Sequence, residues 1–98
     1  NNIVVVSDEI YGDLTYDFPH TPISTLKGMK GKTLYLNGFS KSFAMTGWRV
    51  GFACGPEEII AGMTKIHQYT MLCAPIMGQI GAIEALRGSK RYLVEMKS

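Results

Sequence analysis

The chain has 98 residues, a length that allows one domain but not comfortably two. Hydrophobic residues make up 46% and charged residues 18%, which are proportions of a globular protein rather than a disordered one. The formal net charge is only +2 and the lysines and arginines are scattered, so the sequence lacks the clustered positive charge of a nucleic-acid-binding protein. No run approaches the roughly 18 apolar residues of a membrane span, so no membrane partner is expected.

Two further features concern the surroundings of the chain. The cysteines, Cys54 and Cys73, lie far apart, and we expect buried thiols in a reducing compartment, the cytoplasm, rather than a disulfide. The first residues, Asn1 and Asn2, are neither an initiator methionine nor part of a signal peptide. We therefore expect the chain to be cut from something longer.

Three strands are predicted in the first half of the chain. Residues 3–6 (IVVV) form a continuous β-branched run, which is typical of a strand buried on both faces of a parallel sheet. Residues 33–36 (TLYL) form the second strand, and the long connection before it fits a parallel crossover rather than a tight hairpin. Residues 50–54 (VGFAC) form the third strand, which the short segment before it allows to run antiparallel.

The second half is predicted to be helical. A helix begins near residues 55–58 (GPEE), where proline suits the first turn and the acids complement the helix dipole. Pro75 interrupts the pattern, a second helix follows, and Gly88 ends it. Ser89 is expected to cap a third helix. The predicted fold class is therefore α/β, with a partial mixed sheet of about three strands followed by helices. The residues at helical spacing that support these helices are Ile59, Met63, Ile66 and Thr70, then Ile76, Ile80, Ile83 and Leu86, then Tyr92, Leu93 and Met96.

Five polar side chains are expected at one edge of this sheet. Asp8 follows the first strand and Lys41 follows the second, and the carboxyl ends of parallel strands meet at the edge where open α/β sheets bind ligands. Tyr11, Ser40 and Arg49 belong to the same loops. Together, these five groups suit a cofactor that carries an aldehyde, a phosphate and a basic ring nitrogen.

Each of the five has a separate task in such a site. Lys41 would form a Schiff base with the aldehyde, and Asp8 would keep the ring nitrogen protonated, which makes the ring an electron sink. Tyr11 would hydrogen-bond the phenolic oxygen of the ring. Arg49 offers a bidentate fork for the phosphate, and Ser40 offers a hydroxyl beside it.

Residues 7–11 (SDEIY) and 37–51 (NGFSKSFAMTGWRVG) resemble the fold-type I, pyridoxal-phosphate-dependent aminotransferases, the aspartate/aromatic aminotransferase class I/II family. The resemblance covers essentially the whole chain. It implies that residues 1–98 are a fragment of the pyridoxal-phosphate-binding large domain, in which residues 89–98 would start the connection to the small domain. It also implies that Lys41 is the catalytic lysine, and that the cofactor is pyridoxal 5'-phosphate. The residues that would bind it are Asp8 at the pyridine nitrogen, Tyr11 at the phenolic oxygen, Lys41 at the aldehyde, and Ser40 and Arg49 at the phosphate.

The resemblance further implies what the chain does not contain. In the family, a glycine-rich phosphate loop, an aromatic ring stacked on the cofactor and an asparagine lie upstream, and the arginine that binds the substrate carboxylate lies downstream. Gly38 stands where some members carry a second phosphate-binding hydroxyl. The family site also uses residues of a second subunit, so we expect a homodimeric parent and an inactive fragment.

The leading hypothesis for the function is transfer of an amino group between an amino acid and a 2-oxo acid. C–S lyases and cyclopropane-carboxylate synthases share this fold and these residues, so a lyase outcome remains an alternative. Aminotransferase-like domains also serve as ligand sensors in transcription regulators, and a truncated, non-catalytic remnant is a fourth reading. Residues outside this chain decide between these functions and select the amino acid.

Other polar features are interpreted as structural. Glu9 is interpreted as a solvated loop acid, and His20 and His67 have no partner at metal-ligand spacing, so no metal site is predicted. Residues 31–33 (GKT) end like a nucleotide phosphate loop. Leu26, however, stands where that motif needs a glycine, and the run precedes a predicted strand instead of following one.

Overall fold

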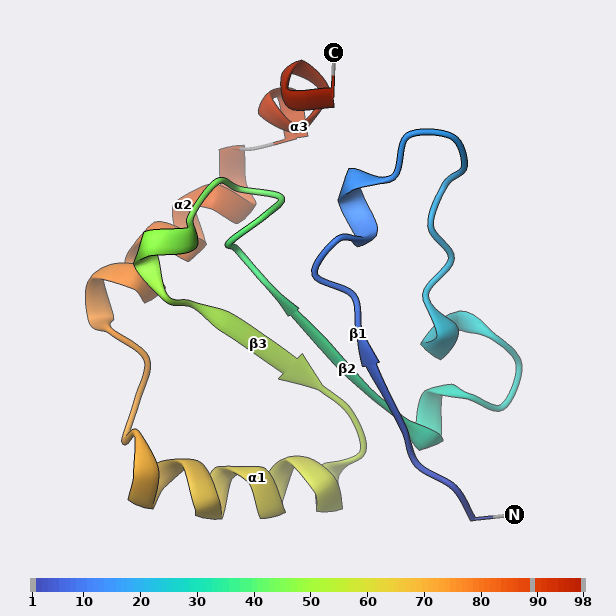
Figure 1. The fold of residues 1–98 in the computed structure, drawn as a ribbon. Coiled ribbons are helices and arrows are strands. Elements are labelled where there is room, and N and C mark those ends of the chain that lie inside the picture. Colours follow the sequence, from blue (N-terminus) through green and yellow to red (C-terminus); the bar gives the residue numbers. More distant parts are fainter. Residues whose placement is uncertain (1, 89, 98) are drawn as a thin grey trace.

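A three-stranded mixed sheet forms the centre of the computed structural model, which describes residues 2–88 and 90–97 (Figure 1). Its strands β1 (Val5–Asp8), β2 (Thr33–Gly38) and β3 (Gly51–Cys54) lie in the order β1-β2-β3. β1 and β2 are parallel, whereas β2 and β3 are antiparallel. The predicted α/β class and the antiparallel third strand are therefore confirmed.

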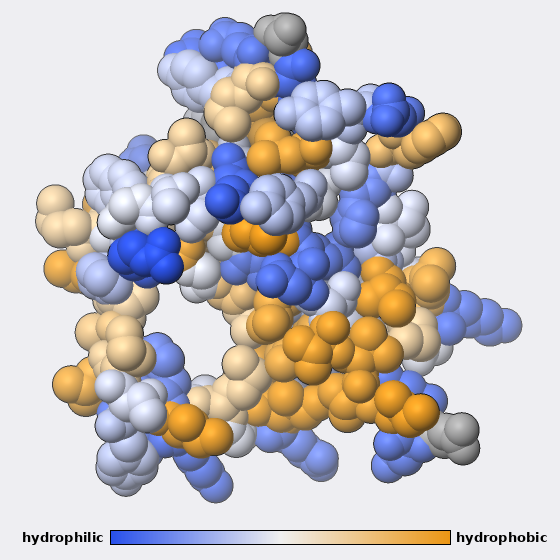
Figure 2. Space-filling model, in the orientation of Figure 1, coloured by the Kyte–Doolittle hydropathy of each residue, from blue (hydrophilic) through white to orange (hydrophobic). Residues whose placement is uncertain are grey.

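The first strand begins two residues later than the sequence predicts. Val5 is the first paired residue and lies opposite Thr33, where β2 begins, so Ile3 and Val4 have no strand beside them. The prediction of a strand buried on both faces is also wrong for the described part of the chain, because Val6 is 62% exposed. Ile3 and Val4 are exposed as well, and Figure 2 shows a large apolar surface on the molecule.

The crossover between β1 and β2 is largely irregular. It contains three short 3-10 turns, η1 (Gly12–Leu14), η2 (Ile23–Thr25) and η3 (Lys30–Lys32), and it runs along the outer side of β1 (Figure 1). The GKT run of residues 31–33 passes from η3 directly into β2. This placement before a strand agrees with the rejection of a nucleotide phosphate loop.

Three helices follow the sheet, as predicted. They are α1 (Glu57–Thr70), α2 (Ile76–Gly88) and α3 (Lys90–Lys97), and α1 carries both of its acidic residues in the first turn, where they complement the helix dipole. The predicted cap Ser89 lies outside the described residues. That residues 89–98 start a connection to a small domain stays a prediction. Within the described ranges, no helix is long and apolar enough to cross a membrane.

The hydrophobic core lies between α2 and the loop that joins β2 to β3. Phe39, Met45 and Val50 of that segment pack with Ala82 of α2. The helix reaches this core through small residues, since Gly78 and Ala82 are its buried positions. The large apolar side chains that reveal the helix in the sequence are exposed instead, and these are Ile76, Ile80, Ile83 and Leu86.

The two cysteines differ from expectation. Cys54 ends the edge strand β3 and Cys73 lies in the connection between α1 and α2, and both are free and exposed, so the prediction of buried thiols is wrong.

Helix α1 has no buried residue, and Figure 2 shows an opening between it and the rest of the molecule. The folded interior of the described chain is therefore formed by the sheet, the loop between β2 and β3, and α2, without α1.

Candidate functional site

The predicted site lies at the carboxyl ends of β1 and β2. These strands are parallel and in register, with Asp8 opposite Leu36, so the loops that follow them leave the sheet at the same edge. Asp8 is exposed, and its Oδ1 accepts a hydrogen bond of 3.2 Å from the backbone N–H of Ile10. The carboxylate therefore faces open space beside the turn that leads to Tyr11.

Lys41 and Tyr11 are brought together from the two loops. Tyr11 precedes the turn η1 and is 59% exposed. The Nζ atom of Lys41 lies 5.6 Å from the centroid of the Tyr11 ring, within the range of a cation–π contact. The amine and the phenol thus share one small volume, as the sequence analysis expects.

Ser40 and Arg49 are linked through Thr46. The Thr46 hydroxyl donates to the backbone carbonyl of Ser40 at 2.9 Å, and the Arg49 guanidinium donates to the backbone carbonyl of Thr46 at 2.8 Å. Ser40 and Arg49 also line one pocket of about 250 Å³, together with Ile10 and Gly38. Thr46 is a positioning group that the sequence analysis did not single out, because its role depends on how the loop folds back.

The backbone at Arg49 adopts a left-handed conformation, with φ of 55°. For a residue other than glycine, this conformation costs roughly 1–2 kcal/mol, so its surroundings must hold it. Helix α2 does so from behind. A Cβ built on Gly78 would lie 2.9 Å from the carbonyl oxygen of Trp48, and one built on Gly81 would lie 3.0 Å from the Trp48 ring. The glycines let α2 press directly against the segment that presents Arg49.

Gly38 has a structural reason to lack a side chain. It is buried where β2 meets β3, and a Cβ built on it would lie 3.2 Å from Cδ1 of Ile10 and 3.2 Å from the carbonyl oxygen of Val50. Contacts this short are tighter than ordinary van der Waals packing. The hydroxyl that some family members carry at this position would need a local rearrangement here.

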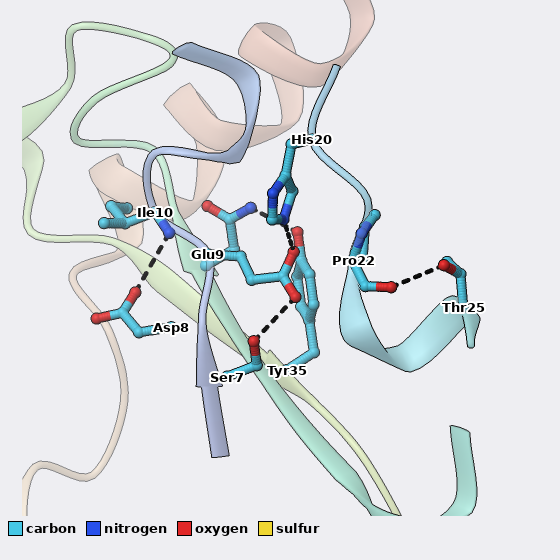
Figure 3. Close-up of polar contacts among 9 residues, drawn as sticks. Ser7, Asp8, Glu9, Ile10, His20, Pro22, Thr25 and Tyr35 are labelled. Atoms are coloured by element: carbon cyan, nitrogen blue, oxygen red, sulfur yellow. Dashed lines mark hydrogen bonds and ion pairs between the residues drawn. The ribbon is translucent and has the colours of Figure 1, made fainter. Parts of the chain in front are cut away.

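One acid beside the site is buried, contrary to the expectation from the sequence. Glu9 is only 4% exposed, which corrects its interpretation as a solvated loop acid. Its carboxylate accepts a hydrogen bond from the Ser7 hydroxyl at 3.0 Å and lies 2.5 Å from Nε2 of His20 (Figure 3). Strand alternation is the signal that could have found it, because Ser7 and Glu9 point to one side of β1 and Asp8 points to the other.

Metal binding has no support in the described part of the chain. No group of three or more histidine, cysteine, aspartate or glutamate side chains there could hold a metal ion. The groups that the five predicted site residues offer are an amine, a phenol, a carboxylate, a hydroxyl and a guanidinium.

Comparisons with known sequences point to one family. A sequence profile described as "Aminotransferase class I and II" matches residues 1–98. The putative aminotransferase YugH of Bacillus subtilis strain 168 is 50% identical over 97 residues, which cover 99% of this chain and 25% of that protein. An aspartate aminotransferase of Pyrococcus abyssi is 42% identical over 93 residues, which cover 94% of this chain and 24% of that protein.

Solved structures give the same result. N-succinyldiaminopimelate aminotransferase from Mycobacterium tuberculosis superposes with a TM-score of 0.92 at 33% identity, over 98% of this chain and 25% of that one. The aromatic aminotransferase from Pyrococcus horikoshii superposes with a TM-score of 0.90 at 41% identity, over 96% of this chain and 26% of that one. The chain thus spans about a quarter of the length of the relatives that it matches. Because the family profile matches all of its residues, the chain belongs to the class I and II aminotransferases.

Proposed function

We propose that this chain forms part of an enzyme that uses pyridoxal 5'-phosphate to move an amino group between an amino acid and a 2-oxo acid. The observation that carries this proposal is the meeting of Lys41 and Tyr11 at 5.6 Å, at the edge of the sheet where Asp8 also emerges. An amine, a phenol and a carboxylate at one sheet edge suit the aldehyde, the phenolic oxygen and the ring nitrogen of this cofactor.

The donor set also fits the phosphate of the cofactor. Ser40 and Arg49 line the same pocket, which lies beside the loop that carries Lys41. A guanidinium binds phosphate in a bidentate, charge-assisted manner, and a neighbouring hydroxyl adds a further donor. The link through Thr46 supports a fixed separation between these two groups.

Bound pyridoxal phosphate would supply an aldehyde for covalent attachment and a ring that withdraws electrons from the substrate Cα. Asp8 would hold a proton at the ring nitrogen, and Tyr11 would orient the ring through its hydroxyl. Ser40 and Arg49 would anchor the phosphate. Lys41 is the proposed catalytic residue, because its Nζ would bind the cofactor and move the proton at the substrate Cα.

Amino transfer is favoured over the other functions that these residues allow. The relatives named above are aminotransferases, with names that refer to aspartate, aromatic and N-succinyldiaminopimelate substrates. The variety of these names means that the amino acid used by this protein must be found by assay. No specific observation favours a lyase or a ligand-sensing domain.

Two further properties are part of the proposal. Tyr11, Asp8 and Arg49 are exposed, which fits a site that is completed by other parts of the protein and by a second copy of it. We therefore propose a homodimer. The free, exposed thiols of Cys54 and Cys73 suit a reducing compartment, which supports a cytoplasmic location.

The test is an amino-transfer assay on the full-length protein that contains this chain. The protein, loaded with pyridoxal phosphate, is given a panel of amino acids together with a 2-oxo acid acceptor, and the new 2-oxo acid is measured. We expect turnover that requires the acceptor and is lost in the Lys41→Ala variant. Product formation without an acceptor would identify a lyase and contradict the proposal.

A further inference from the structure

Buried Glu9 pairs with the partly exposed His20 behind the loop that carries Tyr11. The side chain of Glu9 is 3% exposed and that of His20 is 34% exposed, and the distance between Glu9 Oε2 and His20 Nε2 is 2.5 Å. The second carboxylate oxygen of Glu9 accepts the Ser7 hydroxyl, so both oxygens have a partner. A buried carboxylate requires such partners, because removing it from water is costly.

This pair closes a loop across eleven residues of the chain. Glu9 directly follows the last residue of β1, whereas His20 lies in the irregular segment that follows η1 (Figure 3). The closure draws the segment back against the sheet at the position where the site begins. It acts on a stretch that has little other regular structure, since η1 is its only helical turn among residues 10–20.

The His20 ring also contacts the residue next to Tyr11. A Cβ built on Gly12 would lie 3.0 Å from Cδ2 of His20, so the ring rests almost directly on the Gly12 backbone. From the other side, the N–H of Gly12 donates to the backbone carbonyl of Glu9 at 2.9 Å. Gly12 is thus held between the His20 ring on one side and the backbone carbonyl of Glu9 on the other.

Tyr11 depends on this support because its own ring is largely exposed. Its ring makes a cation–π contact with the Nζ of Lys41, which lies 5.6 Å from the ring centroid. The direction of the ring is therefore set by the backbone of residues 10–12 more than by side-chain packing.

We propose that Glu9 and His20 are positioning residues for the reaction, which hold Tyr11 over Lys41 through the backbone of Gly12. The proposal rests on the function proposed above. Neither residue reaches the reacting groups itself, since the pair contacts Ser7 and Gly12 rather than Lys41.

The arrangement of the three polar groups argues against a separate hydrolytic site. In a nucleophile–base–acid triad, the histidine lies between the hydroxyl and the carboxylate. Here the carboxylate of Glu9 lies between the Ser7 hydroxyl and His20, so the histidine cannot take a proton from the serine. Support of the loop is the task that this order of contacts allows.

The test uses the full-length protein loaded with pyridoxal phosphate and compares His20→Phe, Tyr11→Phe and the double variant. Phenylalanine keeps a ring against Gly12 but cannot bond to Glu9. We expect His20→Phe to lower kcat by between about 10- and 100-fold, the effect of a misplacement of up to about 1 Å, while the cofactor stays attached to Lys41. The double variant should be no slower than Tyr11→Phe alone, because one effect acts through the other.

Two control variants accompany this comparison. His20→Gln, whose amide can still donate to Glu9, should recover most of kcat, and His67→Phe on the exposed helix α1 should leave it unchanged. An unchanged kcat in His20→Phe, or losses that multiply in the double variant, would overturn the proposal.

If His20→Phe does not fold, Gly12→Ala provides a second test. Gly12→Ala adds only a methyl group that displaces the His20 ring by a few tenths of an ångström, and it should lower kcat in the same direction by a smaller factor. A folded Gly12→Ala protein with wild-type kcat would refute the role of this contact. If the unaltered protein neither binds the cofactor at Lys41 nor transfers amino groups, the proposed function fails instead, and the two failures are distinct.

Discussion

Replacing Gly78 with alanine is expected to destabilise the protein, because α2 touches the loop of the site at this residue with no side chain between them. A Cβ built there would lie 2.3 Å from Cγ2 of Val50 and 2.9 Å from the carbonyl oxygen of Trp48. Carbon atoms in contact normally lie about 3.5–4.0 Å apart, so the helix or Val50 would have to move by about 1 Å. Val50 belongs to the core and Trp48 contributes backbone, so neither can turn aside.

A matched substitution isolates the size of this effect. Gly62 lies within α1, and a Cβ built on it meets no atom within 4 Å. Both glycine-to-alanine changes gain about 1 kcal/mol of helix propensity, and this gain cancels when the two variants are compared. What remains is the cost of overpacking, about 1–3 kcal/mol, and the 2.3 Å approach places Gly78→Ala toward the upper end.

Urea denaturation of the two variants measures this difference in the free energy of unfolding. Gly62→Ala should be at least as stable as the unaltered protein, and Gly78→Ala should be the less stable of the two. Because the clash is with the segment that presents Arg49, Gly78→Ala should also bind pyridoxal phosphate more weakly. Equal stability of the two variants would mean that α2 does not pack tightly against Val50 and Trp48 at Gly78.

Three other substitutions test the site directly. Arg49→Lys keeps the charge but loses the guanidinium fork, so the affinity for pyridoxal phosphate should fall by about tenfold or more in an absorbance titration, and an unchanged affinity would argue against a phosphate contact. Asp8→Asn can still accept the bond from the Ile10 N–H but cannot hold a proton at the ring nitrogen, so kcat should fall by about 100-fold or more with unchanged thermal stability, and normal turnover would remove Asp8 from the site. Glu9→Ala leaves the Ser7 hydroxyl and the His20 ring without their partner, so the free energy of unfolding should fall by about 1–3 kcal/mol in urea, and wild-type stability would mean that water replaces the carboxylate.

The strand order and the meeting of Tyr11 and Lys41 at one edge of the sheet could be predicted, because they depend on local and short-range features. The apolar run of residues 33–36 reads as a strand, and the polar residues after it mark the carboxyl end at which Lys41 emerges. The short connection from β2 to β3 allows the antiparallel pairing that the structure contains. The first residue of β1 was harder to predict, since it depends on where the neighbouring strand β2 begins.

The packing could not be read from the same patterns. In α2, the apolar spacing predicts a helix, but the face that packs against the core is the one with Gly78 and Ala82. Small residues are needed on that face because the loop between β2 and β3 lies so close to the helix. The burial of Glu9 depends on His20, a residue that only the folded crossover brings near. The contact of Thr46 with Ser40 and Arg49 likewise requires the loop to turn back on itself. In each case the decisive partner is distant along the chain or reached by a turn of irregular backbone.

Covalent trapping shows whether Lys41 holds the cofactor. The full-length protein is mixed with pyridoxal phosphate, reduced with borohydride and digested, and the pyridoxyl label is mapped by peptide mass spectrometry, with Lys41→Ala as the control. We expect the label to concentrate on Lys41 and to disappear in the control. A label scattered over other lysines, or absent from Lys41, would contradict the assignment of this loop as the cofactor site.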